Sequence, residues 1–448
     1  MLSDALLGAH CKVMIRHSRP QRIGSTPFDS GGQSRLGPMS TDAFAALRRR
    51  DFALMVSGSG LLLTIAILVQ EVALGIALYE LTGDPLTLGL IGLAEALPYI
   101  AVALFGGSLA DRWPRKWLVL GAVGAMLAGS IVLDLIIRNA GKLSLNQLLL
   151  CVYGAVAWVG FARGFYGPAG AALRGSLVPR ELQANASAWS TTFWQTGMIA
   201  GPVLGAFLYA QIGLADTLTV VVVTMAVGLL MLALIRAPAQ LATPAREPLL
   251  KSIGEGFRFV FGNRLLLYSI TLDLVAVLFG GVIAILPAVA KDLLKVGPEW
   301  VGWLRAAPAL GAVLMLLVLA RVSPVHRLWR NMLVAVAGFG IATLVFALSR
   351  NLWLSLVMLF LTGVFDSVSV VIRQYLLQTV PPDHLRGRVL SVNGIFVTCS
   401  NELGAFVSGA GARLLGLAPS IIAGAGLTLV SVGWMWQRGR DLFRLRLS

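Results

Sequence analysis

The chain has 448 residues and a net charge of +15, yet only 13% of its residues are charged and 57% are hydrophobic. A soluble surface needs about twice that share of charged groups, so the composition excludes a soluble multidomain enzyme and predicts a protein covered by lipid. The net charge alone would favour a nucleic-acid partner, but the arginines lie in the gaps between apolar segments, which argues for membrane topology and against nucleic acid.

The chain opens with a polar stretch. Residues 1–52 are predicted to form a disordered and partly amphipathic cytoplasmic tail, because their first part is rich in Gly, Ser and Pro and lacks the apolar core of a signal peptide. Met39 is a second candidate start of translation. The segment 41–51 has the pattern of a short amphipathic helix that leads into the first span.

Twelve apolar segments follow, each long enough to cross about 30 Å of hydrocarbon as a helix. They lie near 53–79, 87–110, 116–137, 146–170, 186–211, 216–236, 264–290, 299–321, 329–349, 352–377, 388–416 and 418–437. This pattern predicts an all-α membrane protein with twelve transmembrane helices and leaves no room for a soluble catalytic domain. We therefore expect no enzymatic activity, no metal site and no cofactor.

The longest internal break, 237–263, divides the spans into two halves of six, 53–236 and 264–437, and a basic tail follows at 438–448. The break contains three prolines and then an amphipathic stretch over 249–261. It is the predicted boundary between the halves, and it lies on the cytoplasmic side.

The two halves resemble each other in sequence. The segment 92–98, GLAEALP, matches 302–308, GWLRAAP, and the segment 177–182, LVPREL, matches 380–385, VPPDHL. Polar and proline positions align as well as apolar ones, so chance similarity is disfavoured. Two similar halves in one orientation are typical of secondary transporters whose substrate binds near the midplane between them.

Basic residues are distributed unevenly between the two sides. With a cytoplasmic amino terminus, that side collects the clusters at 48–50, 112–116, 174–180, 236–264, 321–330, 386–388 and 438–446. The other side receives only scattered basic residues, namely Arg138, Lys142, Lys291, Lys295, Arg350 and Arg413. The positive-inside rule therefore places both termini in the cytoplasm and predicts a multi-pass protein of the cytoplasmic (inner) membrane.

The loop after the second span carries the most specific motif, GSLADRWPRK. It resembles the signature loop of the major facilitator superfamily, G-x-L-A-D-R-x-G-R-K, with Pro114 where that family usually has Gly. The resemblance implies a conformational latch at the cytoplasmic mouth, in which the acid pairs with basic groups across helix ends in one state and releases them in another. The latch residues are Gly107, Asp111, Arg112, Arg115 and Lys116. An ordinary basic loop is the alternative, but it would not require this combination.

The fifth span contains Gly197, Gly201, Pro202 and Gly205 in the run GMIAGPVLGA. This run resembles the antiporter motif of the same superfamily, GxxxGPxxGG, with Ala206 in the last position. Ordinary close packing of helices is the alternative reading. Over nearly the whole chain the resemblance is closest to the branch that contains the enterobactin exporter and the macrolide efflux proteins.

Ionisable side chains inside the spans predict the functional cavity, because each costs about 3 kcal/mol at the bilayer centre and persists only with a partner or water. They are Glu71, Glu95, Arg163, Asp273, Arg305, Asp366 and Glu402. In the repeat, Glu95 corresponds to Arg305 and Arg163 to Asp366, with opposite charges; a structural salt bridge is the alternative for either pair. Asp134 and Arg373 lie nearer span ends and are interpreted as snorkelling.

These features predict a secondary active transporter of the major facilitator fold, with two pseudo-symmetric halves of six helices, that exports small amphipathic molecules such as drug-like compounds or siderophores. In this hypothesis a proton from outside protonates Glu71, Glu95 or Asp273 and weakens its pairing, which returns the bundle to the inward-open state. A proton-coupled nutrient importer and a non-transporting scaffold or sensor remain alternatives. The expected partners are a small-molecule substrate, protons and the bilayer, and a monomer is expected.

Overall fold

The structure is a computed structural model that describes residues 42–110, 114–236, 249–322 and 324–444. Most of the predicted tail, residues Asp111 and Arg112 of the signature loop, and positions 237–248 lie outside this described part. The side chain of Glu402 lies outside it as well. The described residues form helices and short connections, without a strand.

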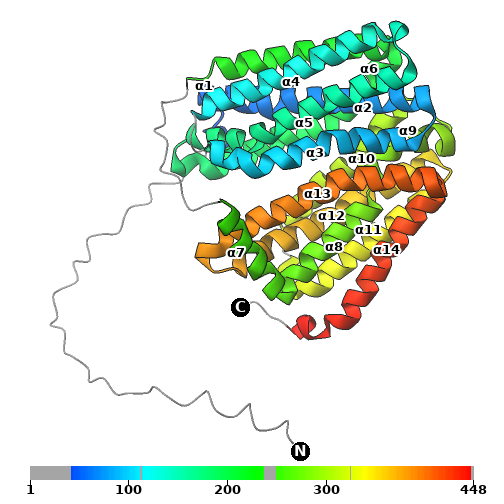
Figure 1. Cartoon of the computed structure of the whole chain (residues 1–448). Helices are drawn as coiled ribbons and strands as arrows, with labels where there is room; N and C mark the ends of the chain where they lie inside the picture. The colour runs from blue at the N-terminus through cyan, green and yellow to red at the C-terminus, as the bar shows by residue number, and fades with distance from the viewer. Residues whose placement is uncertain (1–41, 111–113, 237–248, 323, 445–448) are drawn as a thin grey trace, which may run out of the picture. The chain divides into compact units, whose positions relative to one another are not determined.

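The helices before residue 237 form a first bundle (Figure 1). A π-helical stretch joins α1 to α2, so the first span is one continuous rod. In chain order the elements are α1 (Arg50–Met55), η1 (Val56–Leu63), α2 (Thr64–Thr82), α3 (Pro85–Ala110), α4 (Arg115–Arg138), η2 (Ala140–Lys142), α5 (Leu145–Ser176), η3 (Arg180–Leu182) and α6 (Gln183–Ala233).

The helices after residue 248 form a second bundle. The amphipathic stretch of the central break is helix α7, as its pattern predicts. In chain order the elements are α7 (Leu249–Gly262), α8 (Arg264–Gly280), η4 (Ile283–Ile285), α9 (Leu286–Ala288), η5 (Val289–Leu294), α10 (Glu299–Leu319), η6 (Pro324–Arg327), α11 (Leu328–Leu348), α12 (Leu352–Thr379), α13 (Asp383–Leu415), α14 (Leu417–Arg438) and η7 (Arg440–Arg444).

Local sequence signals set several helix ends. Helix α5 begins with a capping box, in which the Ser144 hydroxyl accepts from the Gln147 backbone N–H and the Gln147 side chain accepts from the Ser144 N–H. Asn263 caps α8 and Asn351 caps α12, each by accepting two backbone N–H groups. Helix α2 ends at Gly83 in the left-handed conformation. These bonds satisfy backbone groups that the helices themselves leave unpaired.

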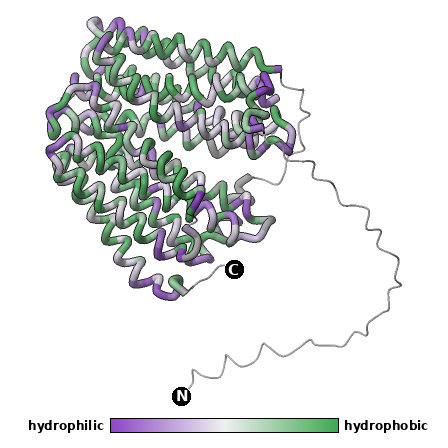
Figure 2. The backbone as a smooth tube through the Cα atoms, turned by 180° about the vertical axis from the view of Figure 1, so that it is seen from behind, coloured by the Kyte–Doolittle hydropathy of each residue, from purple (hydrophilic) through white to green (hydrophobic). Residues whose placement is uncertain are grey.

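The number of spans agrees with the sequence prediction once two elements are considered. Ten described helices are long and apolar enough to cross a membrane. One of them, Arg180–Ala233, reverses at Gly213, whose φ of 74° and ψ of 179° are accessible essentially only to glycine, so it supplies two spans. Helix α13 has 33 residues and is long enough to cross, but it is more polar. Figure 2 shows hydrophobic residues along the helices and hydrophilic ones mainly near their ends.

The same helix contact occurs in both bundles. In the first bundle, Gly160 of α5 lies against the backbone of Glu95 in α3, and in the second, Gly363 of α12 lies against the backbone of Pro308 in α10. A side chain at either glycine would collide with the backbone opposite, so the glycines allow the helices to approach closely. The repeated packing of α3 on α5 and of α10 on α12 confirms the predicted fold of two related helical halves.

We call the end of the molecule at which α1 begins and α14 ends the termini end, and the opposite end the far end. The bundles contact each other at the far end. Helix α6 packs on α10, and α3 packs on α13. A Cβ atom on Gly302 would lie 2.6 Å from the Pro202 carbonyl oxygen, and one on Gly409 would lie 2.8 Å from the Gly89 Cα atom. Both interfaces therefore bring backbone against backbone.

Two local expectations are corrected. Within the predicted amphipathic helix 41–51, positions 43–48 form turns, and α1 begins only at Arg50. The backbone of these turns bonds to α6: the Ala46 N–H donates to Asn185, and Asn185 and Trp189 donate to the Ala43 carbonyl. The seventh span, 264–290, is also not one helix. It ends at Gly280, and the carbonyl of Gly281 accepts a hydrogen bond from Ser408 on α13 at 2.5 Å.

Replacing Gly213 by alanine should lower the free energy of unfolding by about 1–3 kcal/mol, because Cβ makes that backbone conformation strained. Thermal unfolding in detergent measures the change. Gly121→Ala is the matched control, since Gly121 lies inside α4 with open space around it. This variant should not lower the free energy of unfolding. Equal stability of Gly213→Ala and the parent would contradict the reversal at this residue.

Candidate functional site: a charged cavity between the bundles

A cavity of about 580 Å³ lies between the two bundles. Its walls come from α2, α3 and α6 of the first bundle and from α8, α10, α11, α12 and α13 of the second. Most of the lining is apolar, and the broken end of α8 at residues 280–282 forms part of it. A volume of this size suits a drug-sized ligand. The polar lining groups are Glu71, Glu95, Gln195, Arg305, Thr343, Thr362, Asp366, Ser367 and Asn401.

The cavity brings together four of the seven ionisable residues predicted to line it, namely Glu71, Glu95, Arg305 and Asp366. Arg163 does not line it but pairs with Glu95 behind the wall, and Asp273 is buried in the second bundle. The residues that correspond in the sequence repeat do not pair with each other. Each basic group instead meets an acid on a different helix.

The ion pair of Glu71 on α2 with Arg305 on α10 crosses between the bundles. Arg305 donates to Glu71, and its side chain is only 12% exposed, whereas that of Glu71 is 35% exposed to the cavity. A charge-assisted hydrogen bond is stronger than a neutral one, and the burial of Arg305 limits the water that competes for its guanidinium. This pair therefore connects the electrostatics of the cavity to the position of one bundle relative to the other.

The other two intramembrane pairs each lie within one bundle. Arg163 on α5 donates to Glu95 on α3, and its guanidinium carbon lies 5.8 Å from the centre of the Tyr99 ring. In the second bundle, Arg373 on α12 pairs with Asp273 on α8. Movement of one bundle as a body leaves both of these pairs intact.

The structure corrects the interpretation of Arg373 as a snorkelling side chain. It is 3% exposed and Asp273 is 6% exposed, so neither reaches the membrane surface. The available signal was its spacing: Arg373 follows Asp366 by seven residues, which places both on one face of α12. Sequence distance from the end of the span misled because α12 continues to Thr379.

Polar contacts close the far end of the molecule. The Tyr79 hydroxyl at the end of α2 donates to Asp292 of the second bundle at 2.5 Å, and the Lys291 ammonium lies 5.6 Å from the centre of the Tyr79 ring. Arg413 of α13 pairs with Asp84 of the first bundle at 2.9 Å. These contacts hold the bundles together on one side of the cavity.

At the termini end, the described basic residues of the signature loop bind within their own bundle. Arg115 donates to the Ala172 carbonyl of α5 at 3.5 Å, and Lys116 donates to the Ala233 carbonyl at the end of α6 at 2.9 Å. Cations are favourable at the carboxyl ends of helices. Since Asp111 and Arg112 lie outside the described residues, the latch remains a prediction.

The glycines of the fifth span contact α2. Cβ atoms on Gly197, Gly201 and Gly205 would lie 2.8, 2.7 and 2.9 Å from atoms of Thr64, Leu68 and Val69. Pro202 lines the cavity, and its carbonyl lies against Gly302 of α10. The segment thus forms both a helix contact and part of the boundary between the bundles, and its role in antiport remains a prediction.

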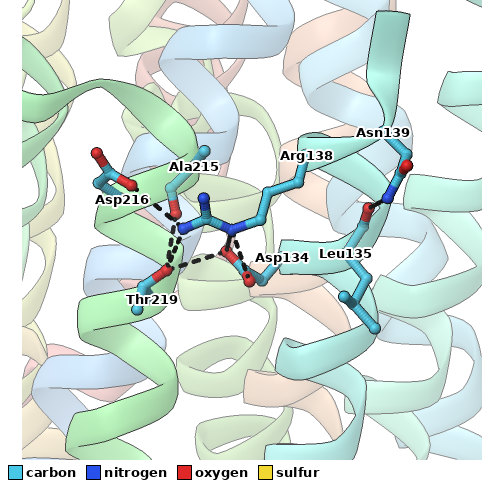
Figure 3. A network of polar contacts seen from close by, with 7 residues as sticks. All are labelled: Asp134, Leu135, Arg138, Asn139, Ala215, Asp216 and Thr219. Carbon is cyan, nitrogen blue, oxygen red and sulfur yellow. Dashed lines mark hydrogen bonds and ion pairs between the residues drawn. The ribbon is translucent and has the colours of Figure 1, made fainter. Parts of the chain in front are cut away.

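A further network lies at the far end, outside the cavity (Figure 3). Arg138 of α4 donates to Asp134 at 3.1 Å, to Asp216 at 3.2 Å and to Thr219 at 2.6 Å. The Arg138 side chain is 42% exposed, so the network ties α4 to α6 with little burial. Its carboxylates provide useful controls for those of the cavity.

Comparisons with known proteins agree with this geometry. The family model described as Major Facilitator Superfamily matches residues 52–409. The multidrug efflux pump Tap of Mycolicibacterium fortuitum is 27% identical over 83% of this chain and 90% of its own length. The enterobactin exporter EntS of Shigella flexneri is 30% identical over 73% of this chain and 77% of its own. A bacterial homologue of the lysosomal transporter Spinster, solved in an inward-facing, unoccupied conformation, shares the fold with a TM-score of 0.65, 16% identity, and coverage of 89% and 99%.

Replacing Asp273 by asparagine should destabilise the protein by about 3–5 kcal/mol, because Arg373 is left as a buried charge without a counter-ion. Thermal unfolding in detergent measures the loss. Asp134→Asn, which removes a partly exposed partner of Arg138, should cost less than about 1 kcal/mol. Equal costs for the two substitutions would contradict the burial of the pair.

Replacing Tyr79 by phenylalanine should favour opening of the far end, because it removes a bond to a charged group worth about 1.5–3 kcal/mol. A cysteine introduced at Ala309 in the cavity wall, with the native cysteines replaced, should then react faster with an impermeant maleimide added from the far side. Tyr209→Phe is the control, since the Tyr209 hydroxyl bonds to Glu80 within the first bundle. Acceleration by both variants, or by neither, would exclude Tyr79 as a far-end contact between bundles.

Proposed function

The chain belongs to the Major Facilitator Superfamily, and on that premise we propose that it is a proton-driven exporter of small amphipathic molecules that works by alternating access. Two bundles rocking around a central site expose that site to one side of the membrane at a time. The names of both curated relatives, a multidrug efflux pump and an enterobactin exporter, support export over import. We propose that the chain lies in the cytoplasmic (inner) membrane with its termini end in the cytoplasm, because basic clusters such as 48–50 gather at that end.

The observation that carries the proposal is the pair of Glu71 and Arg305 across the cavity. Because its members lie on different bundles, their separation depends on how the bundles are rocked. A carboxylate beside a guanidinium favours its charged form, whereas a desolvated carboxylate without one favours its protonated form. The pair therefore links the protonation of Glu71 to the conformation of the transporter.

The cycle has a direction in this proposal. Opening of the far end parts Glu71 from Arg305, and Glu71 then takes up a proton from the outside. Closure of the far end returns Arg305, which expels that proton toward the cytoplasm. Protonation thus follows separation of the pair, in contrast to the hypothesis from sequence that protonation causes it. One proton moves inward at Glu71 for each outward passage of cargo.

The signature loop acts at the opposite point of the cycle. We propose that Gly107, Asp111, Arg112, Arg115 and Lys116 form the latch of the state closed at the termini end, where Asp111 pairs with a basic group across helix ends. In the state closed at the far end, Arg115 and Lys116 donate hydrogen bonds to helix carbonyls, which supports an exchange of partners between the states.

The proposal predicts that inverted membrane vesicles containing this chain accumulate amphipathic compounds when a pH gradient, acidic inside, is imposed. Hoechst 33342 and a panel of labelled amphipathic compounds serve as probes, and vesicles without the chain are the control. Absence of gradient-dependent movement for every compound would overturn proton-driven export. Movement in the opposite direction would instead identify an importer.

Glu71→Gln should lower gradient-driven accumulation by about tenfold or more, because an amide cannot exchange a proton. Exchange of labelled for unlabelled cargo across the membrane should persist, since the amide oxygen still accepts from Arg305. Asp216→Asn is the control, because its carboxylate is 65% exposed at the far end and away from the cavity. Normal gradient-driven accumulation by Glu71→Gln would remove Glu71 from the coupling step.

A further inference from the structure

The charges inside the spans do not balance. The described acids well inside the membrane are Glu71, Glu95, Asp273 and Asp366, and the described bases are Arg163, Arg305 and Arg373. Three ion pairs use every base and all but one acid. Within the described residues, Asp366 makes no hydrogen bond or ion pair within 4.0 Å. The unmatched group is therefore a carboxylate, and it lines the cavity.

The neighbours of Asp366 do not compensate its charge. The charged groups that act on it are Asp273 of α8 and Arg373 of its own helix, and these two pair with each other, so their effects largely oppose. Arg305, the charged group that α10 contributes to the cavity, is paired with Glu71. Helix α13 contributes the neutral Asn401 to the lining.

A lone carboxylate in such a wall has two states of low free energy. As an unpaired anion it is costly, because the cavity wall reduces its hydration and no counter-ion replaces the lost water. It is stable when it holds a proton, and it is stable when a cation from outside the protein lies against it. An empty cavity favours the protonated acid, and a cationic ligand stabilises the ionised carboxylate.

The remaining cavity wall suits the body of a lipophilic cation. Trp194 and Met198 of α6 and Phe339 of α11 line it, together with aliphatic side chains. Aromatic faces attract cations within about 6 Å of the ring centre, and apolar walls gain from covering hydrocarbon. An anion of the same shape would find every described cavity base already paired.

We propose that the cavity binds lipophilic monocations and that Asp366 is their counter-ion. Binding exchanges one ion for another: the carboxylic acid of Asp366 releases its proton to water in the cavity, and the cation takes its place beside the carboxylate. Net charge in the site is unchanged by this step. The inference deepens the proposed function by naming the cargo class, and it rests on that function only for the direction of transport.

The test uses two probes of nearly identical shape and opposite charge. Purified protein in detergent is titrated at equilibrium with tetraphenylphosphonium and with tetraphenylborate, and triphenylphosphine oxide is the neutral reference. The cation should bind saturably and the anion should not. Equal binding of both ions, or preference for the anion, would overturn the proposal.

Variants at Asp366 test the counter-ion. Asp366→Asn should weaken tetraphenylphosphonium binding by about tenfold or more, because the charge-assisted contact is lost, while binding of the neutral reference stays within about twofold. Asp366→Glu should restore most of the affinity for the cation. Asp216→Asn, in the exposed network at the far end, is the matched control and should bind like the parent. Unchanged cation affinity in Asp366→Asn would overturn the assignment.

A pH series in the unmodified protein supplies a readout that does not depend on any variant. Affinity for tetraphenylphosphonium should fall as pH falls through the titration of Asp366, approaching tenfold per pH unit, because one proton competes with one cation. In weakly buffered solution the parent should release up to one proton per cation bound, and Asp366→Asn should release none. A pH-independent affinity without proton release would contradict the exchange.

These measurements separate the two proposals. Binding is read at equilibrium without a gradient, so it is independent of transport. Cation-selective, Asp366-dependent binding with no movement in vesicles would uphold the cargo class and defeat proton-driven export. Gradient-driven movement with binding indifferent to Asp366 would do the reverse.

Discussion

The cost of an unpaired polar group in hydrocarbon is the constraint on which this structure depends. No water competes there, so each backbone group and each charge needs a partner within the protein. Long helices satisfy the backbone along most of the chain. Where the helix of the seventh span stops, at the wall of the cavity, Ser408 of α13 bonds to the carbonyl of Gly281. The irregular segment is thus tolerated where protein and cavity surround it.

The same constraint arranges the charges. Three described arginines inside the membrane each pair with an acid on another helix, and two of these pairs lie within a bundle, one in each. The third, Glu71 with Arg305, crosses between bundles, which is why we propose that its formation depends on conformation. A transporter requires such a dependence, because a coupling ion can drive movement only if its binding differs between the two states. Asp366, left without a described partner, adds a place where cargo itself can complete the balance.

Local pattern was sufficient for most of the fold and insufficient for the site. The amphipathic stretch of α7 lies where the sequence places it, because it depends on neighbours along the chain. The turns at 43–48 and the break at Gly280 do not follow from local pattern, because they depend on bonds to α6 and α13. Arg373 was misjudged for the same reason: its distance from the end of a span says nothing about which acid faces it.

By itself, the sequence determined that this chain crosses a membrane about twelve times, that its halves repeat, that it resembles the major facilitator superfamily, and that a few costly charges lie within its spans. Length, hydropathy and motif spacing carry that information, since they concern segments that each meet lipid in the same way. Only the tertiary structure decided which charges pair, which pair joins the bundles, and which acid is left over. Pairing depends on the rotation of helices that are hydrophobic on all sides, and no periodicity in the sequence records that rotation.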